Sequence, residues 1–493
     1  MKFSKLTLAI ATTIGASASF SAFAIDLYVD TKTKQIYAEP GRGRVLMGAF
    51  ERVEDKPVAT PAEATEIADV RQDLEMKTNE IKALQEHMAE AEKVKVKVDK
   101  KGLQVESADK NFKFNLGGRI QTDANYSVNG NYVEAGTAGT ADPISVDAND
   151  GMEVRRGRID FTGTFYKDWD FKTQVDFADN SVAVKDMFVQ YNGLDFMNFT
   201  GGQQKQNFSQ ELLESSNDLM FTERSLMNVL NAPVVDRALG LNLQSRAKKG
   251  YTAALGFYGD TIAANKNNGK ADEGWSVSGR GTYAPIEEKT KVVHLGIAGN
   301  YRQPNANDQI LDKGLVYEYE TDHMSNLFLI ESDVENINNI SMLGLEAKGL
   351  FGPFSGGAEY THTWLSRGNG DNNLNLDGWY VDAAWSITGE SRHYKQGRFY
   401  KLSPEKAFSF KNGTWGAFEL ATRYSGVDLN DGSFHGGRMH NFTTALNWYF
   451  NDNVRLMADW TRAFDVSYSP VTTTGGGAPN DNNTFTVRAQ LAY

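Results

Sequence analysis

The chain has 493 residues, of which 63 are acidic and 51 basic, giving a formal net charge of −12, and it contains no cysteine. The acidic balance argues against nucleic-acid binding, and the lack of cysteine excludes disulfides, thiol catalysis and cysteine-ligated metal sites. The 46 glycines, 28 phenylalanines and 20 tyrosines, against only 11 prolines, favour many strands joined by turns.

Residues 1–24 have the features of a secretory signal peptide. Two lysines precede an apolar run over residues 6–14, and an Ala-Phe-Ala cleavage site follows at 22–24. The run is shorter than the ~20 residues of a membrane-spanning helix, so we predict cleavage near Ile25 rather than an anchor. Loss of the two lysines leaves 49 basic residues against 63 acidic ones, a net charge of −14. No later stretch is continuously apolar over 18 residues, which argues against helical membrane spans.

The next part of the chain is predicted to contain an irregular segment and then a coiled coil. We expect residues 25–62 to be irregular, whereas residues 63–93 contain neither Gly nor Pro and repeat apolar residues every seven. The two seam positions are occupied by Ile67, Leu74, Ile81 and Met88, and by Val70, Lys77, Leu84 and Ala91. So narrow a stripe predicts a self-associating helix, and the alternative is a helix packed on its own protein.

Residues 94–493 change to a period of two, which is typical of strands. Residues 112–126 place Phe, Leu, Ile and Tyr on one face and polar residues on the other, and residues 159–177 and 484–493 do the same. The predicted strands are 112–127, 151–166, 168–180, 184–193, 195–206, 236–246, 250–260, 273–286, 291–303, 340–351, 354–366, 377–389, 412–426, 437–450, 453–468 and 482–493.

A soluble sandwich would show the same alternation, but three features favour a membrane barrel. The segments are long, aromatic residues gather at their ends, and short connections alternate with long ones. Only the long connection at 390–411 breaks this order. We therefore predict an all-β fold, a 16-stranded antiparallel transmembrane β-barrel in the outer membrane of a Gram-negative bacterium, with the helical coiled coil in the periplasm. A barrel of this size has a lumen that contains water.

Several basic residues are predicted to line this lumen. Alternation places Arg119, Arg156, Arg158 and Lys172 on its side, whereas Arg155 has the opposite parity and reaches the lumen only through a β-bulge. Guanidinium groups suit oxyanions because they donate two parallel hydrogen bonds. The alternative is that these cations are solvated, or are paired with Asp160, Asp170 and Asp176.

Two long connections add further candidates. The connection 207–235, which carries Arg224, is too apolar for the outer surface, so we expect it to fold into the barrel and narrow it. The connection 390–411 spaces Arg392, Lys395, Arg398 and Lys401 three apart, which suggests a basic strip at the periplasmic mouth. The alternative for this strip is a solvated periplasmic turn.

Three segments resemble the phosphate-selective porin O and P family. They are GLQVESADKNFKFNLGGRIQTDANY at 102–126, RRGRIDFTGTFYKDWDF at 155–171 and GWYVDAAWSITGESRHYK at 378–395. The resemblance implies a homotrimer of 16-stranded barrels that passes small anions by diffusion, and it marks Arg119, Arg155, Arg156 and Arg224 as anion contacts. Asp170 and Leu212 stand where the family has constriction lysines, which leaves open a weaker anion preference or a broader solute range.

The leading hypothesis is therefore a passive outer-membrane channel, in contact with membrane lipid, that prefers anions such as phosphate or another oxyanion. The rival is a structural anchor that tethers the envelope through a contact of the coiled coil with the periplasm or cell wall. An enzyme is not expected, because the seven histidines lack metal-ligand spacing and no G-x-S-x-G motif is present. We expect no catalytic residues, metal or cofactor.

Overall fold

The structure is a computed structural model of the chain, and it describes residues 25–50, 61–91, 94–128, 130–134, 144–246, 249–260, 272–305, 314–320, 322–325 and 327–493. The predicted signal peptide, residues 1–24, lies outside the described residues. The chain divides into two compact units, residues 1–90 and 91–493.

The first unit begins with a small antiparallel sheet formed by β1 (Ile25–Asp30), β2 (Ile36–Tyr37) and β3 (Arg44–Phe50). Our expectation of an irregular segment was therefore wrong for residues 25–50. The carboxylate of Asp30 accepts hydrogen bonds from the amides of Lys32 and Thr33 and so closes the turn after β1. Strands of two to seven residues are too short to show a clear period in the sequence.

The helix α1 (Pro61–Ala91) follows, two residues earlier than predicted, and residues 92–93 lie outside the described part of the chain. Proline at the first helical position is favourable because its missing N–H would have no partner there. The apolar seam residues that are described, Val70, Leu74, Ile81, Leu84 and Met88, are all exposed in the single chain. The helix is thus present, and its pairing into a coiled coil stays a prediction. Among the described helices, none is both long enough and apolar enough to cross a lipid bilayer.

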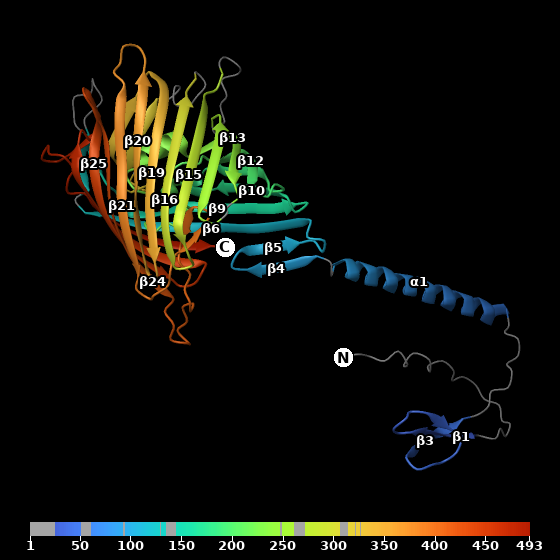
Figure 1. Cartoon of the computed structure of the whole chain (residues 1–493). Coiled ribbons are helices and arrows are strands. Elements are labelled where there is room, and N and C mark those ends of the chain that lie inside the picture. The colour runs from blue at the N-terminus through green and yellow to red at the C-terminus, as the bar shows by residue number, and fades with distance from the viewer. Residues whose placement is uncertain are drawn as a thin grey trace. The chain divides into compact units, whose positions relative to one another are not determined.

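The second unit is a closed antiparallel barrel (Figure 1). Within the described residues its wall has sixteen strands: β6 (Phe112–Val128), β9 (Gly151–Phe165), β10 (Trp169–Asp176), β11 (Ala183–Tyr191), β12 (Met197–Lys205), β13 (Arg237–Ser245), β14 (Tyr251–Tyr258), β15 (Trp275–Glu287), β16 (Lys291–Gln303), β19 (Ile337–Phe351), β20 (Phe354–Arg367), β21 (Leu374–Ser386), β24 (Ala417–Asp431), β25 (Phe434–Tyr449), β26 (Val454–Ser467) and β28 (Asn483–Ala492). The last strand pairs with the first, β28 with β6, which closes the wall. The predicted strand number is confirmed, and every predicted strand end lies within five residues of the observed one.

A hairpin of β4 (Lys95–Asp99) and β5 (Gly102–Glu106) extends the edge of β6 beyond the end of β28. The other described elements of this unit are β7 (Asn131–Glu134), β8 (Ile144–Asp147), β17 (Leu315–Glu320), β18 (Phe328–Val334), β22 (His393–Lys395), β23 (Arg398–Tyr400), β27 (Val471–Thr473), the 3-10 turn η1 (Ala178–Asn180), α2 (Gln210–Leu213) and α3 (Asn228–Val235).

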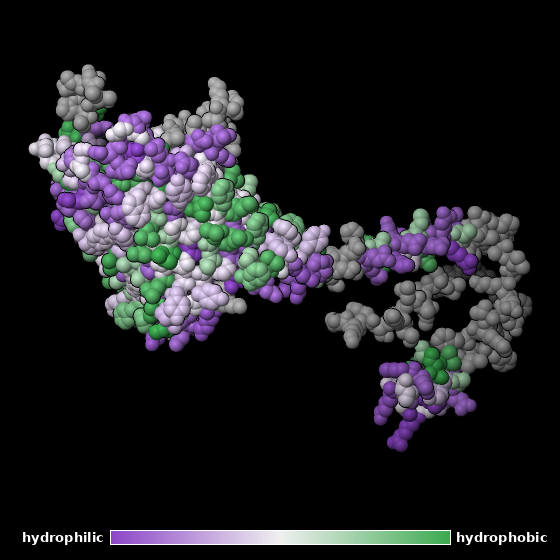
Figure 2. Space-filling model, turned by 45° about the horizontal axis from the view of Figure 1, so that its top comes forward, coloured by the Kyte–Doolittle hydropathy of each residue, from purple (hydrophilic) through white to green (hydrophobic). Residues whose placement is uncertain are grey.

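The two faces of the wall differ as alternation requires. On β6, Arg119 and Gln121 are buried inside the barrel, whereas Ile120 and Tyr126 are 48% and 56% exposed on the outside. Figure 2 shows hydrophobic residues gathered over the wall and hydrophilic ones at its rim. This outer apolar surface is what a lipid bilayer requires of a closed barrel.

Most of the long connections lie at one end of the wall and most of the short ones at the other. The long-loop end carries the connections 177–182, 206–236 and 304–336, and the short-turn end carries turns such as 166–168 and 352–353.

The connection 206–236 folds into the lumen, as its apolar sequence predicted. Phe208, Leu226 and Leu230 are fully buried, and the amide of Thr222 donates to Asp459 of β26 at 2.7 Å. The long connection 387–416 enters from the other end, where Arg392 meets Glu214 of the first connection at 3.2 Å. A connection that fills the barrel interior needs more residues than a turn, which explains its unexpected length at the short-turn end.

Candidate functional site

A cavity of about 620 Å³ lies along the lumen side of β9 to β13, between this wall, the connection 206–236 and residues 396–400. At ~30 Å³ for each molecule it has room for on the order of 20 waters. Among the described residues, its lining has four aspartates, Asp176, Asp179, Asp186 and Asp236. The ten basic residues of the lining are Arg119, Arg155, Arg156, Arg158, Lys172, Lys185, Lys205, Arg224, Arg237 and Arg398. The cavity is therefore strongly cationic.

A β-bulge brings two adjacent arginines to the same side. Gln121 of β6 pairs with Arg156, but the next residue pairs with Val154, so Arg155 is the extra residue of β9. Both guanidinium groups then reach one carboxylate, that of Glu223 in the infolded connection, at 3.0 Å from Arg155 and 3.4 Å from Arg156. The bulge that the parity of Arg155 required is present.

The other cations predicted to lie on the wall differ in how closely a carboxylate approaches them. Arg158 forms a close ion pair with Asp176 at 2.6 Å. Lys172 is paired with Asp186 at 2.7 Å. Arg119 donates to the hydroxyl of Ser216 at 2.7 Å, and its nearest carboxylate oxygen, on Asp160, is 3.9 Å away.

Four cations of the lining have no carboxylate partner within the described residues. Arg224 donates only to main-chain carbonyls, those of Glu211 at 3.1 Å and Glu214 at 2.9 Å. Lys205 likewise donates to the carbonyl oxygens of Leu212 and Glu214. The side chains of Lys185 and Arg398 make no hydrogen bond or ion pair with any described group. In the described part of the chain, none of these four side chains is in an ion pair with a carboxylate.

Sequence reasoning missed Lys185, Lys205 and Arg237. Lys185 is the extra residue of a second bulge, because Gln174 of β10 pairs with Asp186 while the next residue pairs with Val184. A simple alternation therefore gives no reliable face for it. Lys205 is the last residue of β12, where the chain leaves the wall for the infolded connection.

The basic residues of 390–411 do not form one strip. Arg392 is buried between Glu419 at 3.0 Å and Glu214 at 3.2 Å, and burial raises the pKa of Glu214 to about 7 against the opposing attraction of Arg392. Lys401 donates to the main-chain oxygen of Asp452 at 2.6 Å, and burial lowers its pKa to about 8. Arg398 lines the cavity, and Lys395 is exposed. The hairpin of β22 and β23 separates the four side chains because it turns inside the barrel.

A second cavity, of about 270 Å³, lies nearer the long-loop end and shares Arg155 and His323 with the first. His323, in the connection between β17 and β18, shares a hydrogen bond of 2.8 Å with Glu153 of β9. This bond raises the pKa of His323, whereas burial acts in the opposite direction. The histidine therefore connects the long loop to the barrel wall.

Two known proteins are similar to this chain in sequence. Porin O of Pseudomonas aeruginosa is 27% identical over 433 residues, which cover 80% of this chain and 91% of that protein. An uncharacterized protein of Caulobacter vibrioides is 29% identical over 315 residues, covering 62% and 61% of the two chains.

Two solved structures are also similar. The anion-selective porin of Comamonas acidovorans is 15% identical, with a TM-score of 0.47, over 78% of this chain and all of that one. The outer membrane channel DcaP of Acinetobacter baumannii is 12% identical, with a TM-score of 0.45, over 79% and 99%.

The family model described as phosphate-selective porin O and P matches residues 114–493, which include all sixteen strands of the wall except the first two residues of β6. The chain therefore belongs to the phosphate-selective porin O and P family, and it is a porin of the outer membrane, a channel and not an enzyme.

Proposed function

We propose that the protein is a passive diffusion channel that prefers anions, and that small anionic solutes pass through the cationic cavity beside β9 to β13. The observation that carries this proposal is the ratio of charges in the lining, ten basic residues to four aspartates. Channel selectivity follows the charge at the narrow part of the pore rather than the net charge of the protein. The acidic overall composition therefore does not oppose it.

The main contacts for the solute in this proposal are Lys185, Lys205, Arg224 and Arg398. None of these four side chains forms an ion pair with a carboxylate of the described residues. Around them lie the predicted contacts Arg119, Arg155, Arg156, Arg158 and Lys172. These add to the positive potential, although most of them form an ion pair with a carboxylate.

The two departures from the family pattern support a moderate selectivity. Asp170 accepts hydrogen bonds from Thr164 and Asn192, both at 2.7 Å, so its charge is held at the wall. Leu212 lines the cavity, but Lys205 donates to its main-chain oxygen and places an ammonium group beside it. We infer that a general preference for anions, including oxyanions, is favoured over strict selection of phosphate.

The infolded connection 206–236 narrows the lumen in this proposal. It supplies Arg224 to the cavity and Glu223 to the two adjacent arginines of β9. We also propose, from the family, that the barrels form a homotrimer. From the exposed seam of α1 we propose that this helix lies in the periplasm and pairs between copies of the chain. A chain that acts only as an anchor is disfavoured by its membership of a porin family.

The reversal potential in a salt gradient across a planar bilayer tests the proposal. We expect the parent protein to prefer chloride, succinate and phosphate over potassium. Arg156→Ala with Arg158→Ala should reduce this preference, because Glu223 and Asp176 then keep their charge without these partners. Lys395→Ala is the matched control, since this lysine is exposed and outside the cavity lining. Cation preference in the parent protein would contradict the proposal.

A further inference from the structure

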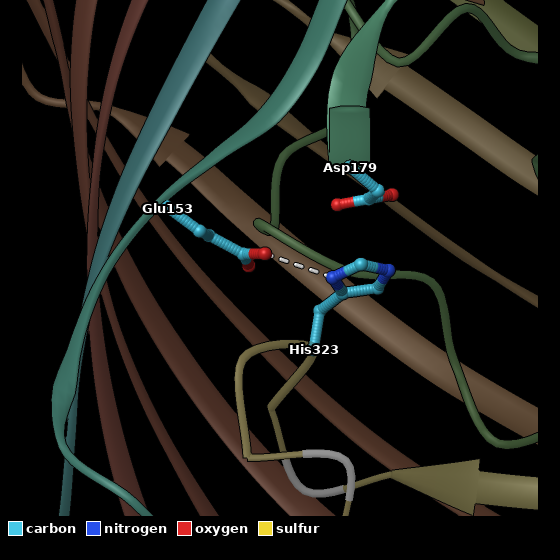
Figure 3. A group of neighbouring side chains, drawn as sticks. All are labelled: Glu153, Asp179 and His323. Atoms are coloured by element: carbon cyan, nitrogen blue, oxygen red, sulfur yellow. Dashed lines mark hydrogen bonds and ion pairs between the residues drawn. The ribbon is translucent and has the colours of Figure 1, made fainter. Parts of the chain in front are cut away.

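Three side chains that are far apart in the sequence meet at the long-loop end of the cavity. Glu153 comes from the start of β9, Asp179 from η1 and His323 from the connection between β17 and β18. One potential ligand atom of each lies within 4.8 Å of those of the other two. Figure 3 shows the three side chains pointing toward one another from three parts of the chain. Sequence spacing gives no sign of this group, because 170 positions separate Glu153 and His323.

The group has unused capacity to bind a cation. Only Oε2 of Glu153 meets His323, at 2.8 Å, and the other carboxylate oxygen, Oε1, is buried without a hydrogen-bond partner in the described part of the chain. Asp179 is exposed, and its side chain makes no hydrogen bond or ion pair with a described residue. A buried carboxylate oxygen without a partner is costly, and a bound cation would remove that cost.

The surrounding charges also favour a cation. Glu320, at the end of β17, acts electrostatically on His323 and brings the local carboxylates to three. Arg155 acts in the opposite direction, but its guanidinium is already paired with Glu223 at 3.0 Å. Three carboxylates and one arginine thus surround this position, whereas the rest of the cavity lining is mostly basic.

The ligand types select the class of ion. Imidazole nitrogen together with carboxylate oxygen suits zinc and similar divalent transition metals, whereas magnesium and calcium take oxygen ligands. Zinc with three protein ligands and one water has metal-to-ligand distances of about 2.0 to 2.2 Å, which places the ligand atoms roughly 3.4 Å apart. The observed 2.8 Å contact and the 4.8 Å limit bracket this spacing. No pair of these ligand atoms is therefore more than roughly 1.4 Å farther apart than zinc requires.

We propose that Glu153, Asp179 and His323 bind one divalent transition-metal ion of the zinc class at the mouth of the cationic cavity. The ion ties the connection between β17 and β18 to β9 and to η1. Because Asp179 and His323 both line the cavity, this tie restricts the mouth and lowers the current through it. The binding site does not depend on the anion preference of the channel.

Direct binding of Zn²⁺ to the full-length protein in detergent is the first test, measured by titration calorimetry. We expect one tight equivalent for the parent protein and at least a roughly tenfold weaker affinity for His323→Ala and for Asp179→Asn. His435→Ala is the matched control, because His435 is an exposed histidine in β25 outside the group, and it should keep the parent affinity. Equal affinity in the parent and His323→Ala proteins would overturn the site.

If His323→Ala weakened binding only by misfolding, Asp179→Asn should still bind Zn²⁺ normally. We expect Asp179→Asn to fold as the parent does, because this side chain is exposed and has no described partner. A second measurement is the single-channel conductance with Zn²⁺ added to each side of a bilayer. We expect a reversible fall in the parent protein that EDTA restores, and no fall in His323→Ala. An unchanged parent conductance at saturating Zn²⁺ would refute the restriction of the mouth. Since binding is measured without ion flow, its failure is distinct from a failure of the proposed anion preference.

Discussion

The two sides of the barrel lumen treat buried charge in opposite ways. Beside β15 to β26 the lumen is filled by apolar residues of the connection 206–236 and of β17 and β18, and four of its cations are paired with carboxylates: Arg280 with Glu346, Lys348 with Asp382, Arg392 with Glu419, and Arg423 with Glu211. Beside β9 to β13 the lumen holds a cavity in which four cations have no described carboxylate partner.

Solvation explains the difference. A charge that is buried without water must be paired or it destabilises the fold. A charge that faces a cavity with room for many waters keeps much of its hydration. The filled side therefore uses its cations for stability, and the cavity side leaves its cations available to solutes. This comparison predicts that substitutions on the two sides will separate stability from selectivity.

Arg280→Met should have the largest effect. Both Nε and Nη2 of Arg280 lie 2.7 Å from the carboxylate of Glu346, which is 4% exposed. Removal of one partner of a buried pair costs about 3 to 5 kcal/mol, because the other charge stays buried. Urea unfolding in detergent, followed by tryptophan fluorescence, measures the free energy of unfolding. The reversal potential should remain that of the parent, and a large change in it would remove the distinction between the two sides.

Leu230→Ala is expected to destabilise the protein somewhat less. Leu230 of α3 is fully buried in the apolar filling, and a cavity of this kind costs about 2 to 5 kcal/mol. Leu243→Ala is the matched control, because Leu243 is 40% exposed on the outer face of β13. The same unfolding measurement compares them, and equal losses would mean that α3 contributes no packed core.

Lys185→Glu combined with Arg398→Glu should change selectivity and leave stability nearly unchanged, since neither side chain has a described partner. Each charge reversal near a passing ion is worth about 1 kcal/mol, roughly a fivefold change in the permeability ratio. We expect the anion preference to be lost or inverted in reversal-potential measurements. The control is Lys395→Glu with Lys411→Glu, two exposed lysines outside the cavity lining, and a similar shift there would point to a surface effect.

The smallest effect is expected when an ion pair is removed as a unit. Arg158→Gln with Asp176→Asn deletes a pair of 2.6 Å and leaves the charge of the cavity unchanged. Lys185→Gln alone removes one positive charge that has no described partner. The permeability ratio should therefore fall more for the single substitution than for the double one. The reverse order would show that paired arginines, not unpaired cations, set the preference.

The strands of the barrel wall can be predicted from the amino-acid sequence alone. Alternation is a local property, so it predicted the strands, the outward face of Ile120 and the inward face of Arg119, and it required the bulge at Arg155. The helix predicted over residues 63–93 is present over 61–91, because its composition and its sevenfold repeat are local features.

The partner of each lumen cation, in contrast, depends on the three-dimensional fold. The partners of Arg392 come from the infolded connection and from β24, and the bulge that presents Lys185 is a matter of register with β10. The meeting of Glu153 with His323 across 170 positions is of the same kind. Pairing depends on which segments the closed barrel encloses together, and no local pattern carries that information.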